Sequence, residues 1–282
     1  MKKVLFALVL VCLFAGCSKL FKTNVEEADN SLTESIRQTI KARNIDADVE
    51  VKRLAKLDAP NGFYFYRVTI KDRDSGDSHE QYVFFDGKFI APDFIKYENS
   101  LSLSKELQFD YNYTDIDTSN LSLLYGKSGA KNVIVKITDF ECPYCRTANA
   151  YLENKLKGGE YDVAVYIIHF PLTSIHRKAE LFAKVFEAGY IMKKNFSHEL
   201  FSNEALLDMT DSDIITYFAS KSENDAKFRE LVYSDGVAQH IKDTVSQAQS
   251  HGINATPVIY INGKRIEGFD AGLIDKAISS FK

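Results

Sequence analysis

The chain has 282 residues, of which 45% are hydrophobic and 26% are charged. This composition is typical of a folded globular protein rather than a disordered one, and the length allows one large domain or two modest ones. The formal net charge is −4 and no basic stripe occurs, so we expect no nucleic-acid partner.

The N-terminus has the pattern of a secretory signal over residues 1–16. Two lysines precede an apolar run that is too short to cross a bilayer as a helix. The run ends in Leu-Phe-Ala-Gly-Cys17, which resembles the lipobox of bacterial lipoproteins, where cleavage precedes a lipid-bearing cysteine. The resemblance implies lipidation of Cys17 and a periplasmic protein held at a membrane, with Ser18 favouring the outer membrane. An ordinary secretory signal with a chance cysteine is the alternative.

Removal of this signal would leave few cysteines for chemistry. Cys12 would be discarded and Cys17 lipidated, so only Cys142 and Cys145 would remain as thiols in the folded body. A secreted protein with one close cysteine pair is not a disulfide-stapled scaffold. In an oxidising compartment, the pair is better placed for chemistry than for closing a loop.

The mature chain is expected to begin with a polar tether and a helix. Leu32, Ile36 and Ile40 recur at four-residue spacing and predict a helix over residues 31–43. Ser31 is placed to cap its N-terminus.

Three strand-like runs follow, separated by turn residues. A helix on an antiparallel sheet therefore makes a small N-terminal α+β domain, after which a polar stretch predicts a linker. The expected bounds are 17–30 for the tether, 47–57, 63–71 and 79–85 for the strands, 31–108 for the domain and 109–126 for the linker.

The second domain is expected over residues 127–282. Its predicted order is β-α-β, a helical block, then β-β-α. A β-branched run predicts a buried first strand, and Asn-Gly between two apolar runs predicts a hairpin. The expected elements are strands at 133–137, 163–168, 258–261 and near 265–266, helices at 143–156 and 271–281, and a helical insertion at about 175–251.

The sequence Cys142-Pro143-Tyr144-Cys145 lies between the first strand and the first helix of this domain. If Pro143 begins the helix, the dipole and the free N–H groups favour a thiolate at Cys142, which we expect to be exposed. Cys145, one turn later, would then resolve a mixed disulfide. Pro143 and Tyr144 would tune the thiolate without adding positive charge. A structural disulfide is the alternative.

Four separated segments carry a family pattern: residues 138–145, residues 169–172 with His176 and Ala179, residues 252–257 and residues 261–264. Together they resemble the Dsb family of bacterial thiol–disulfide oxidoreductases. The resemblance implies a thioredoxin fold, a redox-active disulfide between Cys142 and Cys145, and a cis peptide bond at Pro257 facing Cys142. It also implies that Thr256 and Pro257 bind substrate, and that no cofactor or metal is required.

Features of this chain resemble two different groups within the family. The long helical insertion resembles DsbA, an oxidant. Tyr144, Thr256 and an N-terminal domain of this size resemble DsbG and DsbC, which dimerise through that domain. The resemblance implies an oxidase or isomerase that acts on unfolded or misoxidised secreted proteins, a membrane redox partner, and a homodimer through the N-terminal domain.

Three further residues have competing interpretations. Lys136 lies six residues before Cys142, where the family often carries a buried acid that handles protons for the second cysteine. We expect its stem to pack while its amine reaches water. His169 and His176 are candidate bases or ligands, for which a structural role is preferred.

Two other function classes remain open at this point. The thiols suit Cu(I) or zinc, so a metal-delivery lipoprotein is one alternative. A holdase chaperone that binds unfolded chains through an apolar cleft is another.

Overall fold

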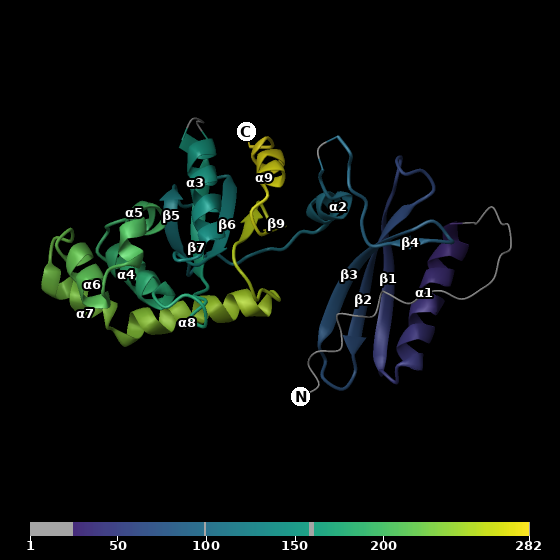
Figure 1. Ribbon diagram of the computed structural model, residues 1–282, viewed down its shortest axis with the longest axis horizontal. Coiled ribbons are helices and arrows are strands. Elements are labelled where there is room, and N and C mark those ends of the chain that lie inside the picture. Colours follow the sequence, from purple (N-terminus) through teal and green to yellow (C-terminus); the bar gives the residue numbers. More distant parts are fainter. Residues whose placement is uncertain (1–24, 99, 158–160, 282) are drawn as a thin grey trace. The chain divides into compact units, whose positions relative to one another are not determined.

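The computed structural model describes residues 25–98, 100–157 and 161–281 (Figure 1). The expected signal peptide, Cys17 and most of the expected tether lie outside the described residues. The chain divides into two compact units, Met1–Tyr111 and Asn112–Lys282. Within the described ranges, no helix is both long enough and apolar enough to cross a membrane.

The first unit is an antiparallel sheet with a helix on each face. Its strands are ordered β1-β2-β3-β4, and alternate side chains of a strand point to opposite faces. Tyr66 and Val68 therefore pack against α1, whereas Phe65 and Phe84 face α2. The elements are α1 (Val25–Ala42), β1 (Ala47–Lys56), β2 (Tyr64–Asp72), β3 (Ser78–Phe85), β4 (Ile90–Ala91) and α2 (Leu103–Tyr111).

Helix α1 begins earlier than the sequence pattern predicted. It includes residues 25–30, which were assigned to the tether, and Ser31 lies inside it rather than at its N-cap. Ala28 is only 2% exposed and extends the buried stripe of Leu32 by one turn. Glu26 suits a first helical turn because its carboxylate complements the positive end of the dipole.

The second unit contains a five-stranded sheet in the order β5-β7-β6-β8-β9. Central strands β6 and β7 run parallel, and the other pairs are antiparallel. Helix α3 connects the two parallel strands as a crossover. The elements are β5 (Ser122–Gly126), β6 (Asn132–Thr138), α3 (Pro143–Lys157), β7 (Val163–His169), β8 (Val258–Ile261), β9 (Lys264–Glu267) and α9 (Ala271–Ile278).

A block of helices lies between β7 and β8. Several begin at a residue whose side-chain oxygen accepts a backbone N–H, as Thr210, Asn224 and Ser234 do. Long helix α8 returns along the sheet and contacts β7. The elements of the block are α4 (Ala179–Ile191), α5 (Ser197–Ser202), the 3₁₀ turn η2 (Glu204–Leu207), α6 (Asp211–Ala219), α7 (Asp225–Val232) and α8 (Asp235–Ser250).

The linker prediction was wrong at its C-terminal end, because residues 122–126 form edge strand β5. The short apolar run that pairs with β7 directly follows polar residues, so the sequence pattern did not separate it from the linker. The hairpin prediction is confirmed: Asn262 and Gly263 both have positive φ, 48° and 78°, as a two-residue hairpin turn requires. The predicted fold class, a thioredoxin-like α+β domain with a helical insertion after an N-terminal helix-and-sheet domain, is confirmed.

Candidate functional site

The two cysteines lie where strand β6 passes into helix α3. Pro143 is the first residue of α3, where its missing N–H costs nothing, so Cys142 directly precedes the helix. Both cysteines are free thiols. Cys145 is fully buried, and Cys142 is only 5% exposed. The expectation of an exposed Cys142 was therefore wrong, because neighbouring loops cover most of its side chain, whereas Tyr144 beside it is 70% exposed.

The surroundings of the cysteine pair lower the pKa of the Cys142 thiol and raise that of the Cys145 thiol. A hydrogen bond from the Cys145 thiol is the largest influence on Cys142, and backbone N–H groups of Cys145 and Tyr144 add to it. Together they outweigh burial and lower the pKa of Cys142 to about 5. Burial raises the pKa of Cys145, as does its hydrogen bond to Cys142. Near neutral pH, Cys142 is therefore the thiolate and Cys145 the proton donor.

The Thr256–Pro257 segment lies against Cys142, far from it in sequence. The peptide bond between Thr256 and Pro257 is cis, which confirms that expectation. The Cys142 sulfur is 3.9 Å from the Thr256 carbonyl oxygen. The Thr256 hydroxyl is buried and makes no hydrogen bond of good geometry, yet it lowers the pKa of both thiols. The structure thus brings together Cys142, Cys145 and Thr256.

Sequence reasoning missed the carboxylate that organises the cysteine loop. Asp139 is 2% exposed, and one of its oxygens accepts the backbone N–H of Glu141 at 2.8 Å. Its other oxygen accepts the N–H of Leu172 at 3.0 Å and lies 2.7 Å from Nδ1 of His176. Asp139 therefore ties the loop before Cys142 to the segment after β7.

Arg146 and Glu141 brace the same loop from other directions. The Arg146 guanidinium donates to the carbonyl oxygens of Phe140 and Leu200 at 2.8 and 3.2 Å. Glu141 accepts the backbone N–H of Lys178 at 2.7 Å, so its side chain has a partner in the helical block. These contacts hold the start of α3 against elements that are remote in the sequence.

His169 and His176, the two candidate bases, stabilise the fold instead. Nε2 of buried His169 lies 2.7 Å from a carboxylate oxygen of Glu187, and His176 contacts Asp139. These contacts support the structural interpretation. In the described part of the chain, no group of three or more His, Cys, Asp or Glu side chains is arranged to hold a metal ion.

The expectation that the Lys136 amine reaches water was wrong. Lys136 is 1% exposed, and its amine donates a hydrogen bond to Oδ1 of Asn149 on α3. The amine also lies 4.4 Å from the centroid of the Phe201 ring. A strand at the centre of the sheet leaves its inward side chains no route to solvent, so β6 carries a buried cation-forming group beneath the cysteine helix.

Known proteins similar to this chain include antiporters and disulfide-forming proteins. Na(+)/H(+) antiporter NhaA 1 of Mycolicibacterium vanbaalenii is 29% identical over 160 residues, which are 55% of this chain and 26% of the antiporter. The chain thus spans about a quarter of the length of that relative. Probable disulfide bond formation protein D of Bacillus cereus is 26% identical over 150 residues, which are 49% of this chain and 68% of that protein.

Among solved structures, BdbD from Bacillus subtilis in its oxidised form has 20% sequence identity and a TM-score of 0.47. The match covers 60% of this chain and 96% of that chain. A family model described as Thioredoxin matches residues 118–278, more than half of the sequence and nearly all of the second unit. The chain therefore belongs to the thioredoxin family.

Proposed function

We propose that this protein is a thiol–disulfide oxidoreductase that exchanges disulfides with secreted proteins through Cys142 and Cys145. The observation that carries the proposal is the placement of the two thiols. Cys142 directly precedes α3, its sulfur lies 3.9 Å from the Thr256 carbonyl oxygen before the cis-proline, and Cys145 is buried one turn later. Hydrogen bonds lower the pKa of Cys142 to about 5, while burial raises that of Cys145. A thiolate attacks disulfides, whereas a protonated neighbour waits for the second step. The similarity to a probable disulfide bond formation protein supports the same class of activity.

The exchange follows from this arrangement. The Cys142 thiolate attacks one sulfur of a client disulfide, a bond forms between the two sulfurs, and the other client sulfur leaves with the electron pair and takes up a proton. Cys145 then loses its proton and attacks the Cys142 sulfur. The Cys142–Cys145 disulfide forms, and the second client thiolate leaves. This direction reduces the client, and the reverse sequence oxidises it.

The segment before Pro257 supports a place for the client. Asn254 and Ala255 are exposed, and Thr256 brings their backbone next to Cys142. An extended peptide paired with this backbone would place its sulfur near Cys142, in the manner of an added strand. We therefore assign substrate binding to Thr256 and Pro257.

The cellular setting is part of the proposal. A lipid on Cys17 would hold the protein at a membrane facing the periplasm, where unfolded or misoxidised secreted proteins are the clients and a membrane protein resets the cysteine pair. Exposed aromatic and aliphatic side chains of the first unit, such as Phe89, Ile95 and Tyr97, support a homodimer through that domain. Sedimentation of the purified mature protein tests the dimer, and mass spectrometry of membrane-extracted protein tests the lipid.

The activity itself is tested with two substrates. Oxidised protein is mixed with a reduced, unfolded substrate to detect oxidation, and reduced protein is mixed with a scrambled substrate to detect isomerisation. We expect turnover in at least one assay and none with Cys142→Ser. Activity of Cys142→Ser equal to that of the native protein would overturn the assignment. A Cys145→Ala variant should trap clients as mixed disulfides, and their identity and redox state would reveal the direction in cells.

A further inference from the structure

Two buried hydroxyls beside the cysteine pair make no hydrogen bond of good geometry. They belong to Thr138, the last residue of β6, and to Thr256. Buried polar groups in folded proteins are nearly always hydrogen-bonded, and leaving one unpaired destabilises the fold. Both hydroxyls act on the Cys145 sulfur. Two unpaired hydroxyls at one reactive sulfur indicate a partner that forms only during the reaction.

The position of Thr138 follows from the way β6 packs against α3. Lys136 and Thr138 are two residues apart on β6, so their side chains point to the same face of the sheet. The Lys136 amine donates to Oδ1 of Asn149, so α3 covers this face. Cys145 precedes Asn149 by four residues and lies on the same side of α3.

The directions of the two elements then bring Thr138 and Cys145 together. Because β6 and β7 run parallel, the helix that connects them runs in the opposite direction. Two residues of a strand span about 6.6 Å, and four residues of a helix span about 6 Å. The step from Lys136 to Thr138 therefore matches the step from Asn149 back to Cys145, and the Thr138 side chain lies level with the Cys145 sulfur.

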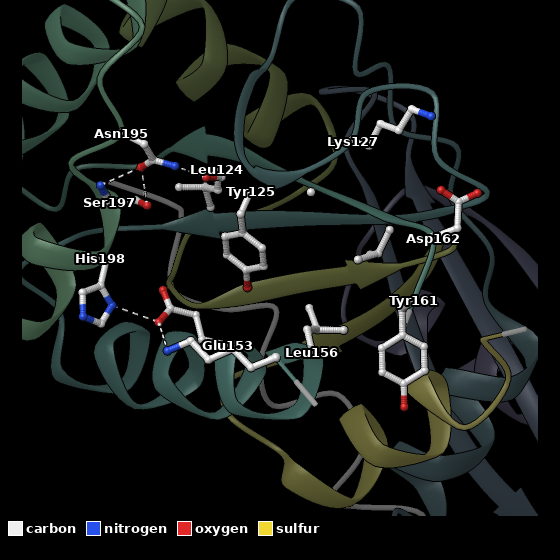
Figure 2. A pocket seen from close by; sticks show the side chains of 13 residues that line it. Leu124, Tyr125, Lys127, Glu153, Leu156, Tyr161, Asp162, Asn195, Ser197 and His198 are labelled. Atoms are coloured by element: carbon white, nitrogen blue, oxygen red, sulfur yellow. Dashed lines mark hydrogen bonds and ion pairs between the residues drawn. The ribbon is translucent and has the colours of Figure 1, made fainter. Parts of the chain in front are cut away.

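The other end of this side of α3 lies in a surface pocket of about 740 Å³. Figure 2 shows Glu153 there, with its Oε2 3.0 Å from Nδ1 of His198. Its Oε1 accepts a hydrogen bond from the Asn149 amide at 2.9 Å. The Glu153 side chain is 14% exposed, whereas Cys145 is fully buried. Little water surrounds the Cys145 sulfur, so a thiolate there depends on donors from the protein.

Three hydrogen-bond donors of the protein meet at the Cys145 sulfur. The hydroxyls of Thr138 and Thr256 and the backbone N–H of Asp139 each favour its thiolate, although burial prevails and raises the pKa of Cys145. The hydrogen bond to Cys142 also raises it. In the mixed disulfide Cys142 carries no charge, so that opposing influence is lost while the three donors remain.

We propose that the Thr138 hydroxyl is a catalytic group that stabilises the Cys145 thiolate while the mixed disulfide is resolved. The Cys145 proton passes to solvent water, the hydroxyl donates to the charged sulfur, and that sulfur attacks Cys142. The Cys142–Cys145 bond forms, the bond from Cys142 to the client breaks, and the client sulfur leaves with the electron pair. The charge on Cys145 exists only during this step, so the hydroxyl stabilises the transition state more than the resting thiol. This role rests on the proposed function.

The test follows resolution alone, without a protein client. Reduced protein is converted at Cys142 to a mixed disulfide with 2-nitro-5-thiobenzoate, and release of the coloured thiolate is timed at pH 7. Thr138→Val removes the hydroxyl and keeps the side-chain shape, and it should resolve roughly 10- to 100-fold more slowly than the native protein. Its midpoint of urea unfolding should not fall, because the hydroxyl makes no other hydrogen bond. Thr147→Val, on the exposed side of α3, should resolve at the native rate.

Two further variants keep the test decisive if Thr138→Val does not fold. Thr138→Ser retains the donor and should resolve at nearly the native rate, whereas Thr138→Ala lacks it and should be slow. A native rate in Thr138→Val, or equal rates in Thr138→Ser and Thr138→Ala, would overturn the proposal. The proposed function fails separately: a protein that needs the hydroxyl for resolution but never exchanges with protein substrates would keep the role of Thr138 and lose that function.

Discussion

Nδ1 of His176 lies 2.7 Å from Oδ2 of Asp139, and this contact links the loop before the cysteines to the chain after β7. The same carboxylate also accepts two backbone N–H groups, so three donors from two separate segments converge on one buried side chain. The position of Cys142 is therefore fixed by a residue three positions earlier, whose backbone oxygen also accepts the N–H of Cys142 at 3.2 Å.

Asp139→Ala should destabilise the protein by about 3–5 kcal/mol, because it leaves buried donors without an acceptor. The free energy of unfolding in urea measures this loss. Asp117→Ala is the matched control: Asp117 accepts the N–H of Ser119 in an exposed turn, and its loss should cost no more than about 1 kcal/mol. Equal stability of Asp139→Ala and the native protein would contradict the role given to the carboxylate.

The ionisation of Cys142 should be visible directly in the reduced protein. Thiolate absorbance near neutral pH should persist on acidification until a midpoint near pH 5. In Cys145→Ala the midpoint should rise, because the hydrogen bond from Cys145 is the largest influence that lowers the pKa of Cys142. The same midpoint in both proteins would show that Cys145 does not stabilise the thiolate.

The lowered pKa of Cys142 also predicts how the stability of the reduced protein depends on pH. In the unfolded chain a cysteine ionises at about 8.5, whereas folding lowers the pKa of Cys142 to about 5. The stabilisation that the Cys142 thiolate gives to the folded state is therefore complete above pH 8.5 and disappears as the pH falls to 5. We expect the difference in unfolding free energy between the native protein and Cys142→Ala, both reduced, to grow from pH 5 to 8.5. A difference in unfolding free energy that is constant or that shrinks over this range would contradict the lowered pKa of Cys142.

Thr256→Val should raise the pKa of both thiols without unfolding the protein. The hydroxyl favours both thiolates but makes no hydrogen bond of good geometry, so a methyl group can take its place at small cost. The thiolate midpoint of Cys142 and the rate of alkylation at pH 6 are the measurements. Thr147→Val, on the exposed side of α3, should leave both unchanged. A lower midpoint in Thr256→Val would be the contrary result.

Most of the second unit follows from local sequence signals, because the strand before the cysteines, Pro143 and the Asn262-Gly263 turn each act over a few residues. The role of Asp139 could not be predicted from local signals, because its partners Leu172 and His176 come from a distant segment. Burial of Lys136 also escaped prediction. A lysine is assumed to reach solvent unless the strand that carries it is known to lie at the centre of a sheet, covered by a helix.

Glu187 should make the protein sensitive to acid through a group other than the two cysteines. Burial alone would raise its pKa, but the hydrogen bond with His169 and the nearby ring of His240, whose Nε2 lies 3.6 Å away, prevail and lower it to about 2. Ser122 donates a further bond at 2.8 Å. The unfolded value is 4.5, so the stabilisation is complete above pH 4.5 and is lost as the pH falls toward 2.

We therefore expect the native protein to lose about 3 kcal/mol from this group between pH 5 and pH 2. Glu187→Gln should be less stable at pH 6 and should show a correspondingly flatter decline, as measured by urea unfolding across that range. Glu180→Gln, whose carboxylate is exposed and paired with Lys184, should follow the native curve. Parallel curves for Glu187→Gln and the native protein would mean that the buried carboxylate is not ionised in the folded state.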